Sequence, residues 1–358
     1  MTRSSREAEV SGRGRLPSGL GRPELPPFPF FVGCARSGTT LLRAIFTAHP
    51  EMAIPDEAHY VMQMLRKRDR YERDGFATEV FLHDLLGHKL FPSWVLPEEI
   101  VRESFHSEPP ADYADAVRRV FSLYAKQLGK PRYGDKSPRN VLNLSLLAKT
   151  FPEAKFVHII RDGRSVALSL LEMPWARPES IVQAARYWRK RVQQGRRAGQ
   201  ALGSSRYHEI RYEALVEDPD SSVRSLCEFI DLPFDPAMLR YYEHEDLFSQ
   251  QSKPSRTIRP KGSKPPPRER TRDGHRHQPP TKGLRDWRTQ MSKKDLALFE
   301  VAAGDLLDEL GYERGAGRIA AWINISGRLQ AVSSDARFAA YRLVGRTKTL
   351  PAERPESG

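Results

Sequence analysis

The chain has 358 residues, which is enough for one large domain or two ordinary ones. It carries 58 Lys and Arg against 45 Asp and Glu, a formal net charge of +13, and its mean hydropathy is −0.59. This balance predicts attraction to an anionic partner. No run of about 18 uncharged apolar residues occurs, so we expect no membrane span. Two cysteines and the lack of an apolar secretory stretch at the start lead us to expect a cytoplasmic protein without a disulfide framework.

The first half of the chain begins with a polar tail and then a strand, a loop and a helix. Residues 1–26 are rich in Arg, Ser, Gly and Pro, and we expect them to be disordered. An apolar run at 28–33 stops at glycine, and an amphipathic helix follows at 39–49. The stretch from 57 to 126 is predicted to form several helices with charged faces.

The second half alternates in the same way. A short strand is expected near 132–136, and Ser137 with Pro138 is expected to open a helix as its N-terminal cap. Strands at 155–160 and 206–212 are each followed by a helical pattern, and a long helix lies between them at 179–201. Strands separated by helices predict an α/β fold, a P-loop-like parallel sheet flanked by helices, whose ligands bind beyond the carboxyl ends of the strands.

We expect a single domain over residues 27–312, closed by a helix near 292–311, and a C-terminal extension at 313–358. Within the domain, residues 252–282 are predicted to form a flexible, basic, Pro-rich loop, because proline recurs and apolar residues nearly vanish. The stretch 252–288 holds twelve Lys and Arg against three Asp and Glu, a net +9 of the chain's +13. We expect this segment to order over a nucleotide or to gather an acidic acceptor.

The loop between the first strand and the first helix is the strongest chemical signal. Gly33 and Gly38 enclose four residues, as in a Walker A loop, but Thr39 stands where that loop has its lysine. The cation is at Arg36 instead. Backbone N–H groups at such a turn, together with the positive end of the helix, favour a phosphate-like anion. One such group fits this loop better than a triphosphate, although a plain strand-to-helix turn is the simpler alternative.

A second anion signal follows the strand at 155–160. Arg161 stands at the end of that strand and Ser169 lies eight residues later in the next helix. Both side chains would converge on a second phosphate if the helix starts near that ligand. The alternative is a surface arginine and an unrelated helical serine, with about equal weight when this segment is taken alone.

These segments resemble the sulfotransferases that use 3′-phosphoadenosine 5′-phosphosulfate (PAPS). The sequence motifs are most similar to those of protein-tyrosine sulfotransferases and bacterial relatives. The similar segments are RSGTTLLRAIFTAHP, RDGRSVALSL and IRYEALVEDP. The similarity extends from about residue 28 to 312. It implies a nucleotide cosubstrate with two anionic ends and transfer of a sulfuryl group to a hydroxyl acceptor.

The resemblance implies roles for individual residues. Those that would hold the 5′-phosphosulfate are Arg36, Ser37, Gly38, Thr39 and Thr40. Arg161 and Ser169 would bind the 3′-phosphate, and Tyr212 would contact the adenosine. The family often closes over the cosubstrate with Lys-Gly-x-x-Gly-Asp-Trp. Lys282 and Gly283 are the counterparts here, in a segment that is one residue short and lacks the second glycine.

The catalytic residues that we expect are Glu57, Arg36 and Lys136. Sulfuryl transfer needs an in-line nucleophile, charge stabilisation and a base. By the resemblance, Glu57 removes the acceptor proton, with His59 as the substitute, and the two cations stabilise charge. From spacing alone, Glu57 is about equally well explained as a carboxylate at a helix N-terminus. Lys136 is alternatively explained by helix-cap solvation with Asp135. No metal is expected, because the donor is already activated.

Two rival functions remain open at this point. One is a P-loop-like nucleotide kinase, which the threonine at position 39 disfavours. The other is nucleic-acid binding through 252–288, although residues 252–282 contain no aromatic side chain for base stacking. The expected partner is a hydroxyl-bearing small molecule, lipid, glycan or tyrosine peptide, and a homodimer is left open.

Overall fold

The computed structural model describes residues 25–173, 178–243, 283 and 285–315. The expected disordered tail up to residue 24, the basic Pro-rich loop at 252–282 with Lys282, and the extension beyond residue 315 lie outside the described residues. Those three sequence-based predictions therefore stay predictions.

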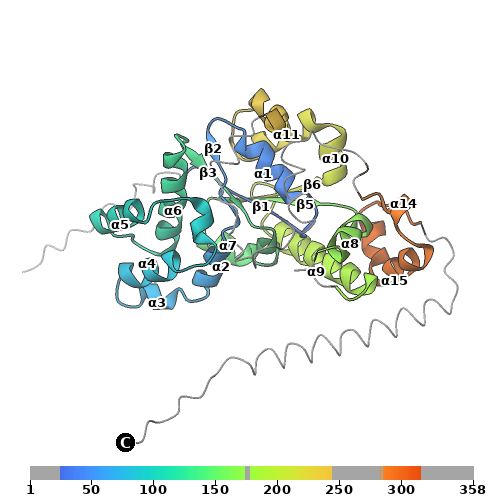
Figure 1. Cartoon of the computed structure of the whole chain (residues 1–358), viewed down its shortest axis with the longest axis horizontal. Coiled ribbons are helices and arrows are strands. Elements are labelled where there is room, and N and C mark those ends of the chain that lie inside the picture. The colour runs from blue at the N-terminus through green and yellow to red at the C-terminus, as the bar shows by residue number, and fades with distance from the viewer. Residues whose placement is uncertain (1–24, 174–177, 244–282, 284, 316–358) are drawn as a thin grey trace, which may run out of the picture.

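Four parallel strands form the central sheet, in the order β4-β1-β5-β6 (Figure 1). Their bounds are Asp135–Lys136 for β4, Phe28–Gly33 for β1, Ala154–Ile160 for β5 and Tyr207–Arg211 for β6. β1 and β5 are almost continuously apolar, as strands covered on both faces are. The predicted α/β fold with a parallel sheet is confirmed.

The pleat of β1 sends alternate side chains to two separate cores. Phe28, Phe30 and Val32 join the core beneath α6 (Tyr113–Gln127) and α7 (Leu144–Thr150). Phe31 points the other way. Helices on both faces bury the sheet, which leaves the loops at the carboxyl ends of the strands as the place for a ligand.

The Phe31 face is covered by helices that lie together in Figure 1. They are α1 (Thr39–Thr47), α10 (Tyr212–Glu217), α11 (Pro219–Phe229) and η3 (Pro236–Glu243). α9 (Ile181–Gln200) contacts β1, β5 and β6 from the opposite side. It also packs against α8 (Gly163–Leu171) and α15 (Lys293–Glu309).

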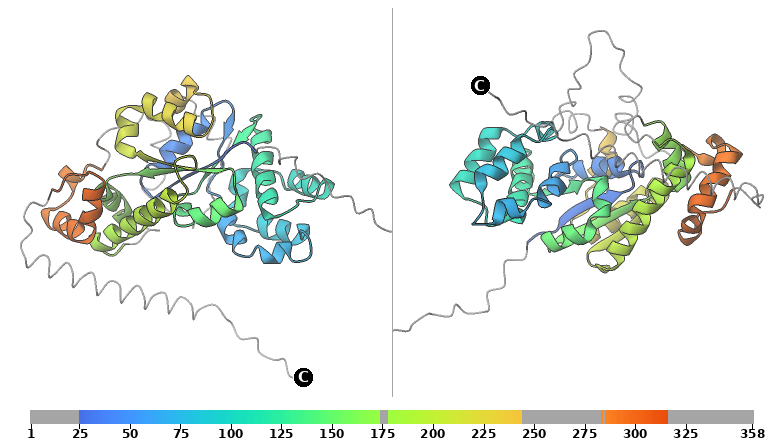
Figure 2. Two further views of the ribbon diagram at one scale, coloured as in Figure 1. Left: turned by 180° about the vertical axis from the view of Figure 1, so that it is seen from behind. Right: turned by 90° about the horizontal axis from the view of Figure 1, so that it is seen from below.

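Figure 2 shows α2–α6 at one end of the molecule and α14 with α15 at the other, in both views. The expected run of helices after residue 57 is confirmed. The remaining elements are α2 (His59–Leu65), α3 (Asp69–Glu72), α4 (Thr78–Leu86), η1 (Phe91–Trp94), α5 (Glu98–Ser107), η2 (Pro138–Leu142), α14 (Trp287–Gln290), and a two-stranded parallel ladder of β2 (Met52–Ala53) and β3 (Arg132–Tyr133).

One local prediction is right in position and wrong in mechanism. A helical turn, the 3-10 helix η2, begins at Pro138 with Ser137 before it, but the Ser137 side chain makes no cap hydrogen bond. The hydroxyl instead donates to Asp135 Oδ1 at 2.8 Å, because the buried carboxylate is the stronger acceptor. Separately, none of the described helices is both long and apolar enough to cross a bilayer.

Candidate functional site

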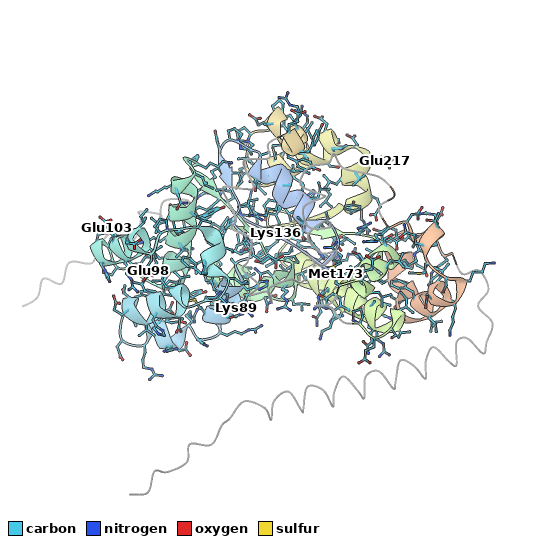
Figure 3. The ribbon with its side chains drawn as sticks, viewed as in Figure 1. Lys89, Glu98, Glu103, Lys136, Met173 and Glu217 are labelled. Carbon is cyan, nitrogen blue, oxygen red and sulfur yellow. The ribbon has the colours of Figure 1, made fainter. Side chains whose placement is uncertain are left out.

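The residues predicted to carry chemistry gather at one edge of the sheet. The loop at 34–38 follows β1, Lys136 ends β4, Arg161 follows β5, and Tyr212 follows β6. Parallel strands bring their carboxyl ends to the same edge, so four separate segments of sequence meet there. Figure 3 shows Lys136 in the middle of the molecule, away from the outer helical end that carries Glu98 and Glu103.

The loop after β1 has the backbone of an anion-binding turn. Arg36 has a φ of 73° and Gly38 a φ of 102°, and Gly38 precedes α1 directly. A Cβ at Gly38 would come within 2.5 Å of the Tyr212 ring, so both the space and the backbone require glycine. Thr39 and Thr40 form the first turn of α1, whose N–H groups have no partner within the helix.

Ser37 is an independent indication that a polar ligand binds in this loop. Its side chain is fully buried, and its Oγ has no hydrogen-bond partner among the described residues. A buried hydroxyl left unsatisfied is unfavourable by about 1 to 3 kcal/mol. A phosphate or sulfate oxygen in the loop would satisfy it, so the residues at 36–40 fit an anionic group.

Arg36 joins the two anion-binding segments. Its Nε donates to Ser169 Oγ at 2.9 Å, and its carbonyl oxygen accepts from Arg161 Nη1 at 3.3 Å. The guanidinium of Arg161 lies 4.3 Å from the centre of the Tyr212 ring. The structure therefore brings together Arg36, Arg161, Ser169 and Tyr212, which the sequence places on three different segments.

The start of α8, the helix that carries Ser169, is held by buried polar contacts. Asp162 caps α8 by accepting the Arg164 N–H at 2.9 Å, and the fully buried Arg164 pairs with Asp162 and with Glu300 of α15 at 2.8 and 3.1 Å. Trp188 of α9 donates to the Arg161 carbonyl at 3.1 Å. These contacts hold the start of the predicted second anion-binding segment, at residues 161–164.

A charged cluster lies at the end of β4, the strand that pairs with β1. Lys136 Nζ contacts Glu57 Oε1 at 3.0 Å, and His59 Nε2 lies 2.8 Å from Glu57 Oε2. Lys136 is buried, whereas the Glu57 side chain is 28% exposed. The helix-cap alternative for Lys136 is not observed, because its described partner is Glu57 and not Asp135. The proposed base, its substitute His59 and the proposed cation are in direct contact.

The cluster keeps Glu57 ionised. Burial alone would raise the pKa of the Glu57 carboxyl, but Lys136 and His59 outweigh burial and hold that pKa well below its usual range. Glu57 is therefore a carboxylate at neutral pH and accepts protons. Its basicity is low as long as the ammonium of Lys136 stays beside it.

Sequence reasoning missed a buried hydrogen-bond network behind this cluster. Asp135 is fully buried and accepts from Ser137 Oγ and from Asn140 Nδ2, both at 2.8 Å. The Ala58 N–H donates to Ser137 Oγ at 3.1 Å. A charged residue at the end of the expected strand near 132–136 was the available signal, and Asp135 entered the sequence analysis only as a helix-cap partner in the alternative explanation of Lys136.

Arg43 makes a second unpredicted contact, from α1. This buried side chain pairs with Asp56 and donates to the Ile54 carbonyl at 3.1 Å. It therefore ties the helix after the phosphate loop to the segment that carries Glu57.

The structure describes Gly283 and residues 285–287 of the expected closing segment. Gly283 is exposed, has a φ of 77° and accepts the Asp286 N–H at 3.2 Å. No contact recorded for the described residues joins it to the loop at 34–38. Within the same ranges, no group of three or more His, Cys, Asp and Glu side chains is arranged to hold a metal ion.

A profile of the sulfotransferase family matches residues 27–236, more than half of the chain. Among characterised relatives, protein-tyrosine sulfotransferase A of Caenorhabditis elegans is 27% identical over 234 residues, which are 63% of this chain and 54% of that protein. Protein-tyrosine sulfotransferase 1 of Danio rerio is also 27% identical, over 63% of this chain and 58% of that protein. The chain thus spans about half the length of these relatives.

Two solved structures share the fold. The sulfotransferase domain of the Synechococcus PCC 7002 olefin synthase aligns with a TM-score of 0.53 and 21% identity, over 82% of this chain and 99% of that one. The sulfotransferase domain from the curacin biosynthetic pathway aligns with a TM-score of 0.52 and 19% identity, over 82% and 100%. Since the family profile covers more than half of the chain, including both predicted anion-binding segments, this chain belongs to the sulfotransferase family.

Proposed function

We propose that the chain transfers a sulfuryl group from PAPS to a hydroxyl acceptor. The observation that carries this proposal is the contact of Arg36 with Ser169 and Arg161. It brings the two predicted anion-binding segments into direct contact, as one nucleotide with two anionic ends would require. The Glu57–Lys136 pair lies at the same edge of the sheet and provides a base and a cation.

PAPS supplies an activated sulfuryl group, and the protein residues hold and orient it. Residues 36–40 bind the 5′-phosphosulfate with backbone N–H groups, the Ser37 hydroxyl and the Arg36 guanidinium. Arg161 and Ser169 bind the 3′-phosphate, and Tyr212 lies beneath the adenosine portion. Lys282 and Gly283 are proposed to close over the nucleotide, as the family resemblance implies.

Glu57 accepts the proton of the acceptor hydroxyl as the new oxygen–sulfur bond forms. The bond from sulfur to the bridging phosphate oxygen breaks in line with it, and Lys136 and Arg36 stabilise the charge that develops there. An anion near Lys136 competes with Glu57 for the ammonium group. The pKa of Glu57 then rises from its depressed value, which strengthens the base when the donor is in place.

The acceptor is a hydroxyl compound, and the relatives favour no single class. The similar animal proteins are named for protein tyrosine, whereas the two structures that share the fold are domains of an olefin synthase and of the curacin pathway. We therefore keep a small molecule, a lipid, a glycan and a tyrosine peptide as candidates. We propose the cytoplasm as the location, since both cysteines are free and buried.

Transfer of ³⁵S from labelled PAPS tests the function. The full chain is incubated with a panel of phenols, alcohols, glycans and tyrosine peptides, and with extracts of its source cells, and labelled products are identified by mass spectrometry. We expect one acceptor class to be labelled and the label to be lost in Glu57→Gln. Binding of PAP without any labelled product would contradict the proposed transferase function.

Ligand-induced thermal stabilisation separates the proposal from the kinase. PAP in the absence of Mg²⁺ is expected to raise the melting temperature, because residues 36–40 and Arg161 bind two single phosphate groups. ATP with Mg²⁺ is expected to have little effect, since Thr39 stands where the Walker lysine would be. Stabilisation by ATP with Mg²⁺ and not by PAP would favour the kinase.

A further inference from the structure

Asp135 is a buried carboxylate behind the Glu57–Lys136 pair. Its exposure is 0%, and both oxygens accept hydrogen bonds, from the Ser137 hydroxyl and from the Asn140 amide. No ion pair recorded among the described residues includes it. Its direct hydrogen-bond donors are both neutral, and a buried charge without an ion-pair partner is unfavourable inside a protein.

The hydrogen bonds have a fixed direction. The Ser137 hydroxyl has one proton, and Asp135 can only accept when it is ionised, so that proton points at Asp135. The lone pairs of Ser137 Oγ are left to accept, and the Ala58 N–H donates to them at 3.1 Å. Ala58 is the residue after Glu57. The carboxylate thus orients a hydroxyl that holds the backbone beside the proposed base.

The same carboxylate belongs to the strand that carries the proposed cation. Asp135 pairs with Phe30 and Lys136 with Phe31 in the register of β4 on β1. The network therefore fixes both members of the Glu57–Lys136 pair, which come from segments 79 residues apart. Lys136 is fixed through the sheet, and Glu57 is fixed through Ser137.

Stability does not explain why a carboxylate occupies this position. Burial raises the pKa of Asp135 to about 6, against the opposing effects of Ser137, Lys136 and Asn140, so its ionised form is less favourable in the folded protein than in water. An amide would satisfy the same donors after rotation of the neighbouring groups, without a buried charge. Carboxylates under such strain concentrate at functional sites.

We propose that Asp135 is a positioning residue that sets the geometry of the Glu57–Lys136 pair through Ser137 and the Ala58 N–H. The inference rests on the proposed function in one respect, that Glu57 acts as the base. The alternative is a purely structural role, in which Asp135 only satisfies buried polar groups.

The test substitutes Ser137 in two ways, so that loss of the hydrogen bond from the Ala58 N–H can be told apart from a general loss of folding. Ser137→Ala removes the acceptor for the Ala58 N–H, whereas Ser137→Thr keeps a hydroxyl. Amide hydrogen exchange at Ala58, PAP affinity by calorimetry and turnover with ³⁵S-labelled PAPS are measured on the full chain. In Ser137→Ala we expect exchange at Ala58 to be about 10-fold faster, turnover to be about 10-fold lower and PAP affinity to be unchanged, with recovery of all values in Ser137→Thr.

A double-mutant cycle with Glu57→Gln tests the route of the effect. If Ser137 acts through Glu57, adding Ser137→Ala to Glu57→Gln lowers turnover no further. Glu153→Gln is the matched control, since it breaks a largely buried pair with Arg118 before β5, at the opposite edge of the sheet. It is expected to lower stability without changing turnover or exchange at Ala58.

Normal turnover in Ser137→Ala with faster exchange at Ala58 would overturn the positioning role. An additive loss in the Glu57→Gln background would overturn it as well. Normal turnover in Glu57→Gln alone would instead refute the proposed base, which keeps the two failures distinguishable. If Ser137→Ala does not fold, Ser137→Cys keeps the volume with a weaker donor and acceptor, and the same outcomes apply.

Discussion

Glu57 has properties at the residue scale that a surface carboxylate lacks. Lys136 and His59 contact its two oxygens and keep it ionised, and its partner Lys136 ends β4, the strand beside β1 that leads into the proposed anion-binding loop. An exposed glutamate at a helix N-terminus would need neither contact. The choice between base and helix-dipole carboxylate, which the sequence leaves open, is therefore open to a direct kinetic test.

Replacing Glu57 by Gln keeps the shape and removes the base. We expect turnover to fall by at least about 100-fold, the usual contribution of a general base, while PAP affinity stays within about 3-fold. Glu51→Gln is the matched control, because Glu51 is exposed at the far end of α1. Steady-state kinetics and calorimetry check this, and turnover close to that of the wild type in Glu57→Gln would rule out the assignment.

Asp135 gives a second residue-scale prediction, on stability. Its pKa rises from 3.8 to about 6 on folding, so between these pH values the folded protein keeps a proton that the unfolded chain has released. The free energy of unfolding therefore falls as pH rises through this window. Asp135→Asn has no such proton. We expect its stability relative to the wild type to increase by about 2 kcal/mol from pH 4 to pH 7.

Urea unfolding of both proteins at the two pH values measures this difference. The exposed Asp74→Asn serves as the control and is expected to stay within about 0.5 kcal/mol of the wild type at both. A relative stability of Asp135→Asn that does not change with pH, or that decreases, would mean that Asp135 is not strained in the folded protein.

At the element scale, α1 is held at both ends. Its first turn forms the anion-binding loop, and beyond its last turn the buried Lys130 donates to the carbonyls of Thr47, His49 and Met52 at 2.7, 2.8 and 3.0 Å. These carbonyls belong to buried residues. Lys130 thus fixes the helix end and the turn that leads into β2.

Lys130→Met removes the shared donor from three buried carbonyl groups. We expect a loss of about 3 kcal/mol in the free energy of unfolding, since unsatisfied buried acceptors are costly. Urea denaturation measures the loss, with the exposed Lys126→Met as the matched control. A loss below about 1 kcal/mol would show that water replaces the ammonium group, and that Lys130 is not what holds α1.

Element types were predictable from the sequence, whereas contacts between distant segments were not. The apolar run of β1, the glycines around the loop and the amphipathic period of α9 follow from local rules, and each was predicted. The bond from Arg36 to Ser169 joins residues 133 positions apart. Ser137 shows why local rules fail, because capping statistics cannot see a buried carboxylate that competes for its proton.

At the scale of the whole molecule, charge and chemistry are separated along the chain. Two thirds of the net charge is carried by residues 252–288, most of which lie outside the described residues. The strand ends and loops at the proposed anion-binding edge of the sheet belong to other segments. Lys282 and Gly283 are proposed to close over the nucleotide, and the rest of the basic segment would assist by raising the local concentration of an anion.

Deleting residues 254–276 tests that idea. We expect the KM for PAPS or for an acidic acceptor to rise, and the effect to shrink at high salt because long-range attraction is screened. Kinetics at low and high ionic strength measure it. Unchanged KM values for both substrates would mark the segment as a solvated linker.

The central claim is that this edge of the sheet binds a nucleotide with two anionic ends. Calorimetric titration of the full chain with PAP and with adenosine 5′-phosphate, in the absence of Mg²⁺, tests it most directly. We predict one PAP site per chain and at least about 10-fold weaker binding of the nucleotide without the 3′-phosphate, because Arg161 and Ser169 would lose a charged partner. Equal affinity for the two nucleotides, or no binding of PAP, would contradict the account.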